Sequence, residues 1–228
     1  MSGERIEEAR PRNDGLSTTA LLLALVASLV PLFTVISGGA WAALAFVLAA
    51  VLLGAGYLLR RLRVGAVLVT LILAAVWTAI MTAVFFSDVA WLFVIPSGEA
   101  FARVPRLIEI ASNDIAVGVA PIDASASLTF LIVGAVGLLA IALDHVVLTA
   151  RMPLLAGVAL IAVWLIPTLA VPRPIDLWAF TLLALALLWL LRTETRGRDR
   201  TRSTAAPRGG VGAVAAVIAA SAVVIAVI

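Results

Sequence analysis

The chain has 228 residues and a formal net charge of +3, with 64% hydrophobic and 13% charged residues and a mean hydropathy of +1.19. Soluble globular domains are about 45–50% apolar and about 25% charged. The composition therefore excludes a soluble domain with one anchor helix and predicts an integral membrane protein. The sequence has no cysteine and one histidine, which excludes disulfides and thiolate metal sites and argues against a zinc site built from histidines.

The first 17 residues form a charged tail that mixes arginines with acidic residues. The apolar run that follows is longer than the hydrophobic region of a signal peptide, and it contains no convincing cleavage site. We therefore expect a short cytoplasmic tail over residues 1–17 and a first helix that is retained.

Seven apolar runs reach or approach the roughly 20 residues that a membrane-spanning helix needs. Because backbone polar groups have to be satisfied within each run in hydrocarbon, each run is expected to be helical. The prediction is an all-α polytopic bundle of about seven transmembrane helices, six of them in a membrane domain over residues 18–191, with a kink at Pro31. The runs are Thr18–Ile36, Ala40–Leu59, Val64–Phe86, Leu128–Thr149, Leu154–Val171, Ile175–Leu191 and Gly210–Ile228.

The arginines predict which side of the membrane each connection faces, because cytoplasmic loops are enriched in basic residues. With a cytoplasmic N-terminus, only Arg103, Arg106 and Arg173 fall outside. The thirteen inner arginines are Arg5, Arg10, Arg12, Arg60, Arg61, Arg63, Arg151, Arg192, Arg196, Arg198, Arg200, Arg202 and Arg208. The tryptophans follow the same scheme: Trp41, Trp91 and Trp178 fall near the outer interface, Trp189 falls near the inner one, and Trp77 and Trp164 lie deeper as expected packing residues.

The outer loop over residues 87–127 is expected to carry a short amphipathic helix on the outer membrane surface. Pro105 is predicted to start or kink this helix, and the stretch 118–121 to end it. The helix either supports an extracytoplasmic domain or only covers apolar surface of the bundle. Its apolar positions are Phe101, Val104, Ile108, Ala111 and Ile115, and its polar positions are Arg103, Arg106, Glu109 and Asn113.

The segment 192–209 is polar, rich in arginine and punctuated by Gly and Pro. We expect a disordered cytoplasmic connector there that enforces topology and contacts anionic lipid headgroups. The last run, 210–228, has small residues at Gly212, Ala216 and Ala220 that suit close helix packing. It ends at Ile228 without a polar residue, so we expect a truncated last helix whose continuation emerges on the outer side.

Chemistry-bearing motifs are scarce. The sequence has no nucleophile elbow, zinc-protease motif, Walker A loop or dinucleotide fingerprint, and Gly54 to Gly56 is interpreted as a packing site. Arg103 and Arg106 are expected to offset part of the acidic outer loop, and its carboxylates show no metal-ligand spacing. We therefore predict no catalytic, cofactor-binding or metal-binding residue and no nucleic-acid partner. The loop carboxylates are Asp88, Glu99, Glu109, Asp114 and Asp123.

Two acidic residues qualify as functional candidates within the membrane, where ionisable groups are costly. Asp144 lies near the inner end of the fourth run, directly before the single histidine, His145, and Asp176 lies at the mouth of the sixth. Asp144 and Arg151 are seven residues apart and so share a helix face. We hypothesise that Asp144 pairs with an inner-loop arginine and pins the fourth helix to the hairpin of the second and third.

The stretch "LDHVVLTARMPLLAGVALIAVWLIP", residues 143–167, resembles a segment of the TgpA-type N-terminal membrane domain. In that family an Asp closes one spanning helix, a Thr-x-Arg-x-Pro turn opens the next, and a Leu-Ala-Gly-rich helix ending in Pro follows. The topology of the whole chain is more loosely similar. The matching positions are Asp144, Thr149, Arg151, Pro153, Leu155, Ala156, Gly157 and Pro167.

The resemblance implies a bacterial plasma-membrane protein with an extracytoplasmic transglutaminase-like domain that carries a Cys-His-Asp triad, and a MoxR-type ATPase as a partner system. No triad residue is carried over, because the chain has no cysteine. The expected function is a non-catalytic membrane anchor for such a domain, which would lie beyond residue 228. The alternative is a small multi-pass transporter or lipid-handling protein that uses Asp144 and the outer loop.

Overall fold

The computed structural model describes residues 14–170 and 177–202 of the chain. Within these residues the fold is almost entirely helical, which agrees with the all-α prediction; the one pair of strands has two residues each. The elements in chain order are α1 (Asp14–Leu29), α2 (Leu32–Val35), β1 (Ile36–Ser37), α3 (Trp41–Arg61), α4 (Ala66–Phe85), α5 (Gly98–Val117), β2 (Ile122–Asp123), α6 (Ala126–Asp144), the π-helix η1 (His145–Thr149), α7 (Pro153–Ala170) and α8 (Leu177–Arg202).

The expected apolar runs coincide with helices wherever the structure describes them. Four helical segments are long and apolar enough to cross a membrane: Gly15–Val35, Trp41–Arg61, Ala66–Phe85 and Ala126–Thr149. Two further apolar helices, Pro153–Leu169 and Leu177–Thr193, are shorter than this criterion requires. The seventh expected run, 210–228, lies outside the described residues.

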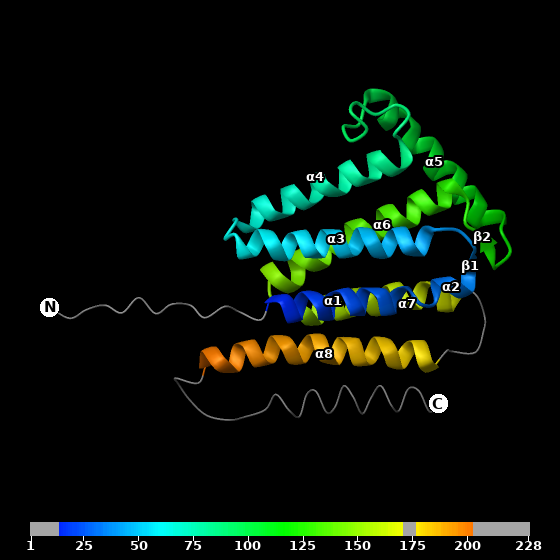
Figure 1. Cartoon of the computed structure of the whole chain (residues 1–228). Helices are drawn as coiled ribbons and strands as arrows, with labels where there is room; N and C mark the ends of the chain where they lie inside the picture. Colours follow the sequence, from blue (N-terminus) through cyan, green and yellow to red (C-terminus); the bar gives the residue numbers. More distant parts are fainter. Residues whose placement is uncertain (1–13, 171–176, 203–228) are drawn as a thin grey trace.

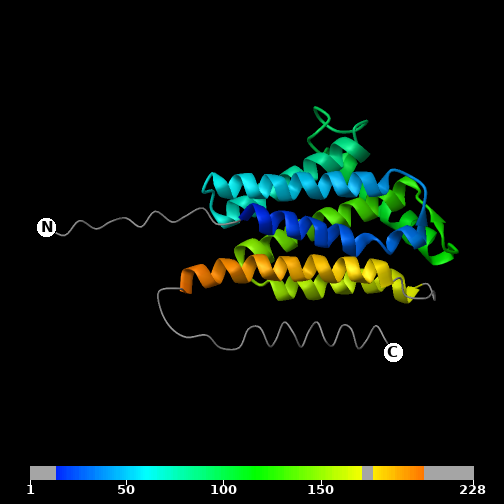
Figure 2. The same cartoon turned by 60° about the horizontal axis from the view of Figure 1, so that its bottom comes forward.

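Helices α1, α3, α6, α7 and α8 run side by side along one axis of the bundle, and α5 crosses that direction at one end (Figure 1). Helix α3 contacts α6, α4 and α1, and α1 contacts α7 and α8 on its other side. Helix α5 contacts α6 (Figure 2 gives a second view of the bundle). The two ends of the bundle therefore differ. At one of them α1, α4 and α7 begin and α3, α6 and α8 finish, whereas α5 lies at the opposite one.

The prolines explain some helix boundaries and not others. The first apolar helix is interrupted between Leu29 and Leu32, as predicted for Pro31. Pro105 does not start the loop helix, contrary to one expectation. Ser97, eight residues earlier, caps the helix by accepting a hydrogen bond from the backbone N–H of Ala100. Pro167 lies inside α7, which continues to Ala170, in agreement with the expected run Leu154–Val171 but not with a helix that ends at the family-motif proline.

Helix α8 corrects the expectation of a disordered connector from residue 192 onward. The helix continues through the polar sequence as far as Arg202. Arg and Glu are good helix formers, so the change to a polar composition does not end the helix. The rest of the expected connector lies outside the described residues.

The loop helix α5 ends at Val117, next to Gly118, as the sequence predicted. Ala100 and Ala111 of this helix are buried against the rest of the protein. The larger apolar residues of the same helix remain exposed: Phe101 by 62%, Ile108 by 42% and Ile115 by 52%. The apolar stripe predicted from the sequence is therefore only partly buried against the bundle.

Two glycines on α6 make room for Trp77 on the neighbouring helix α4. The indole N–H of Trp77 on α4 donates to the carbonyl of Gly134 at 3.2 Å, and a Cβ atom at Gly137 would collide with the Trp77 ring. Trp77 and the buried Trp164 are thus packing residues, as expected. Trp41 differs from the expectation of an interfacial residue, since it is only 2% exposed and packs against Phe33.

Candidate functional site: a buried ion pair where α3 and α6 end

A charged pair joins the ends of α3 and α6. Arg60 lies one residue before the end of α3, and Asp144 is the last residue of α6. Nη1 of Arg60 donates to Oδ2 of Asp144 at 2.6 Å, and Nη2 donates to Oδ1 at 2.9 Å. This two-bond geometry is the strong form of an arginine–carboxylate interaction. The predicted pairing of Asp144 with an arginine of the neighbouring hairpin is confirmed, and the partner is Arg60.

The pair is shielded from the surroundings. The side chain of Asp144 is 3% exposed and that of Arg60 is 15% exposed. The Nε atom of Arg60 is also buried and has no acceptor among the described residues. Asp144 is therefore the one carboxylate that compensates the Arg60 charge in the described structure, and each partner depends on the other to remain charged in an apolar interior.

Gly56 provides the space for this pair. A Cβ atom at Gly56 would lie 2.9 Å from Oδ1 of Asp144 and 3.3 Å from Nη2 of Arg60. Gly54, two residues earlier on the same helix, has no neighbour within 4 Å of the corresponding position. The sequence analysis interpreted Gly54 to Gly56 as one packing site and did not distinguish the roles of the two glycines. The available signal was that Gly56 lies four residues before Arg60 and so shares its helix face.

Asp144 and His145 do not form an acid–base pair. His145 is exposed, and its Nδ1 atom lies 3.3 Å from the hydroxyl of Thr70 on α4, while Asp144 binds Arg60. The sequence analysis did not identify Thr70. The two consecutive side chains thus contact different helices, because neighbouring positions on a helix point about 100° apart.

The turn after Asp144 contains the first family-motif positions. The π-helix His145–Thr149 continues α6, the backbone N–H of Met152 donates to the carbonyl of Val146 at 2.9 Å, and Arg151 has a φ of 59°. Helix α7 then begins at Pro153, a position where proline is favoured because its missing N–H has no partner within the helix. The motif Thr-x-Arg-x-Pro therefore forms the reversal between two antiparallel helices.

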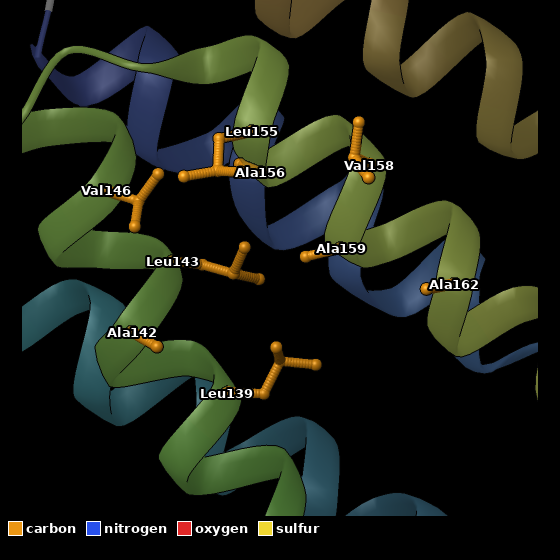
Figure 3. Close-up of a pocket in the computed structure, with 9 residues that line it drawn as sticks. All are labelled: Leu139, Ala142, Leu143, Val146, Leu155, Ala156, Val158, Ala159 and Ala162. Carbon is orange, nitrogen blue, oxygen red and sulfur yellow. The ribbon is translucent and has the colours of Figure 1, made fainter.

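The remaining motif positions lie on α7, which borders an apolar cavity. A Cβ atom at Gly157 would meet Leu187 of α8 at an ordinary contact distance of 3.8 Å. A cavity of about 220 Å³ lies between α6 with η1 and α7 (Figure 3). Its lining consists only of leucine, alanine and valine: Leu139, Ala142, Leu143, Val146, Leu155, Ala156, Val158, Ala159 and Ala162. Nothing in this lining provides a proton donor, a nucleophile or a metal ligand.

A second, exposed charge cluster lies at the opposite end of the bundle, where α5 begins. Arg103 donates to Asp88 and to Glu99, each at 2.7 Å. The hydrogen bond from Arg103 lowers the pKa of Asp88 below its ordinary value, so this pair persists at neutral pH and is lost only in acid. Arg103 thus offsets two of the loop carboxylates, as predicted. Among the described residues no group of three His, Asp or Glu side chains could hold a metal ion; Asp176, the other candidate, lies outside them.

The fold and this site define a class: a bundle of apolar, membrane-type helices pinned by one buried ion pair. A family model described as the TgpA N-terminal domain matches residues 23–228. The chain therefore belongs to the TgpA N-terminal domain family, which confirms the resemblance. No curated protein and no solved structure matches the chain significantly. The family match and the apolar helices together indicate a membrane-associated domain of a transglutaminase-like protein.

The first prediction concerns the charge of Asp144. The substitution Asp144→Asn leaves the buried Arg60 guanidinium without its counter-charge, so we expect the free energy of unfolding to fall by roughly 3–5 kcal/mol. The double variant Asp144→Asn with Arg60→Gln should recover part of that loss. Unfolding of the purified protein in detergent measures both. The control Arg61→Gln removes the same charge from an exposed neighbour and should change little. Unchanged stability of Asp144→Asn would contradict a structural role for the pair.

The second prediction uses the two glycines of α3 as a matched pair. Gly56→Ala places a methyl group against Asp144 and Arg60, and we expect overpacking to cost about 1–3 kcal/mol. Gly54→Ala adds the same methyl group where nothing lies within 4 Å, so its stability should stay within about 1 kcal/mol of the parent protein. Unfolding midpoints of the two variants measure the difference. Equal midpoints would show that the ion pair does not need the space at Gly56.

Proposed function

We propose that this chain is a non-catalytic polytopic anchor that holds an extracytoplasmic transglutaminase-like domain at the bacterial plasma membrane. The observation that carries the proposal is the family match over residues 23–228 of a chain that has four spanning-length apolar helices. The absence of cysteine from the sequence supports a non-catalytic role, because the triad of a transglutaminase-like enzyme needs a cysteine nucleophile.

The proposed topology places the N-terminus and the arginine-rich connections in the cytoplasm and residue 228 at the outer face. The separation of the arginines along the bundle supports this topology. The α3–α4 turn, the α6–α7 turn and the end of α8 all lie at one end of the bundle (Figure 1). Arg103 and Arg106 belong to α5 at the other end. An asymmetry of this kind is the usual marker of the cytoplasmic side.

The arginine-rich end suits contact with anionic lipid headgroups, where each arginine near the surface contributes about 1 kcal/mol. We include this contact in the proposal. A MoxR-type ATPase as a partner system stays a prediction from the family resemblance.

The third prediction tests the topology. The 228-residue chain has no cysteine, so any labelling by a thiol reagent comes from the one cysteine that is introduced. We expect Asn113→Cys, on the exposed side of α5, to react with a membrane-impermeant maleimide added to intact spheroplasts. Leu62→Cys, in the α3–α4 turn and 67% exposed, should react only after permeabilisation. The reversed pattern would contradict the proposed orientation while leaving the spanning helices in place.

The fourth prediction separates an anchor from a transporter. We expect the reading frame to continue beyond Ile228 into a domain with Cys, His and Asp. We also expect no ion or solute flux through the purified chain in liposomes above that of protein-free vesicles. A stop codon directly after Ile228 would weaken the anchor proposal. A flux that Asp144→Asn abolishes and Arg61→Gln leaves intact would overturn it.

A further inference from the structure

The loop between α4 and α5 ends in an exposed apolar tip. Its five consecutive residues are Trp91, Leu92, Phe93, Val94 and Ile95, and they are 73%, 82%, 70%, 45% and 53% exposed. We call residues 91–95 the apolar finger. Large apolar side chains scattered singly over a surface need no explanation, whereas a contiguous exposed group indicates an interaction site.

The backbone of the finger holds these side chains outward in a tight turn. The N–H of Trp91 donates to the carbonyl of Ile95 at 2.9 Å, and the N–H of Ile95 donates back to the carbonyl of Trp91 at 3.0 Å. Between them Leu92 and Phe93 have φ values of 52° and 63°. Turns with two such residues favour Asn and Gly, because a bulky side chain is strained at positive φ. Strain of this kind at an exposed position points to a use for the side chains themselves.

The finger lies next to a helix that spans the length of a bilayer core. Helix α4 has 20 residues, which corresponds to about 30 Å and matches the hydrocarbon thickness of a membrane. The finger begins six residues after Phe85, the last residue of α4. The segment between α4 and α5 projects from the side of the bundle near the end of α4 in both views (Figures 1 and 2). Exposed residues on α4 itself, such as Leu71 and Val84, are also apolar.

Polar groups flank the finger on the aqueous side. Asp88 lies three residues before Trp91, and Arg103 connects it to Glu99 in the first turn of α5. A charged cluster beside an apolar tip that contains a tryptophan is the arrangement expected at the boundary between headgroups and acyl chains.

We infer that the apolar finger inserts into the boundary between headgroups and acyl chains of the leaflet at the α5 end of the bundle. The loop then makes a second membrane contact, separate from the spanning helices, and holds the start of α5 against the membrane surface. The inference rests on the proposed spanning of the bilayer by α4, but not on which leaflet faces the cytoplasm or on any domain beyond residue 228.

The fifth prediction tests the depth of the finger in lipid vesicles. The 228-residue chain is labelled with a nitroxide at one introduced cysteine, and collisions with oxygen and with a water-soluble nickel chelate are compared. Phe93→Cys and, as an independent site on the finger, Leu92→Cys are the test positions. Ala75→Cys, exposed at the middle of α4, is the lipid control, and Asn113→Cys on the polar face of α5 is the water control. We expect both finger labels to favour oxygen, as the label at Ala75 does, and the label at Asn113 to favour nickel.

Each other outcome overturns a distinct claim. Finger labels that favour nickel while Ala75 favours oxygen would show a water-exposed loop on a spanning bundle, and only the insertion would be wrong. Finger labels shielded from both reagents would show that protein, such as a second copy of the chain, covers the finger instead of lipid. A label at Ala75 that favours nickel would overturn the spanning of α4 as well. Because the finger side chains are exposed, these substitutions should leave the unfolding midpoint unchanged, which excludes misfolding as the cause.

Discussion

The buried pair of Arg60 and Asp144 is the interaction on which the arrangement of the helices depends. Two charges at the ends of apolar helices are stable only together, because an isolated charge at the centre of a membrane-spanning helix costs about 2.5–3.5 kcal/mol on insertion scales. The two hydrogen bonds of 2.6 and 2.9 Å fix the distance and the rotation of α3 relative to α6. Because separating the two groups would leave an uncompensated buried charge, any arrangement of α3 and α6 that breaks the pair is penalised.

Several features of the neighbouring structure surround this pair. Position 56 has no side chain, because a Cβ atom there would press on both members of the pair. Directly after Asp144 the chain leaves α-helical geometry in the π-helix His145–Thr149, and it reverses at Arg151. Two turns before Asp144, on the same face of α6, Gly137 allows the close approach of Trp77 from α4 and of Leu48 from α3. Helix α6 is thus fixed against its neighbours both by charge and by shape.

The sequence was sufficient to predict the helices and the existence of the pair, but not its details. Apolar runs of spanning length leave helices as the stable form, so the spans were predictable. Three arginines of the neighbouring hairpin, Arg60, Arg61 and Arg63, could have reached Asp144. Arg60 does so because it shares a face with Gly56, whereas Arg61 points away from that face and Arg63 lies beyond the helix end with a φ of 60°. The proline pattern misled only where Pro105 was expected to start the loop helix, since a cap at Ser97 begins α5 earlier. The apolar finger was missed because Leu92 and Phe93 are not residues that indicate a turn.

The same ion pair bears on the choice between a static support and a transporter. Asp144 is the one fully buried charged residue among those that the structure describes. A transport cycle that used its carboxylate would have to separate it from Arg60, and removing one partner of a buried pair costs about 3–5 kcal/mol unless the substrate replaces the lost charge. The apolar cavity beside α7 offers no polar group for a substrate of that kind, since leucine, alanine and valine line it. A pair held by two short hydrogen bonds, with Gly56 reserved for it, is better suited to keeping α3 and α6 in one fixed arrangement, and that is the property an anchor for another domain requires.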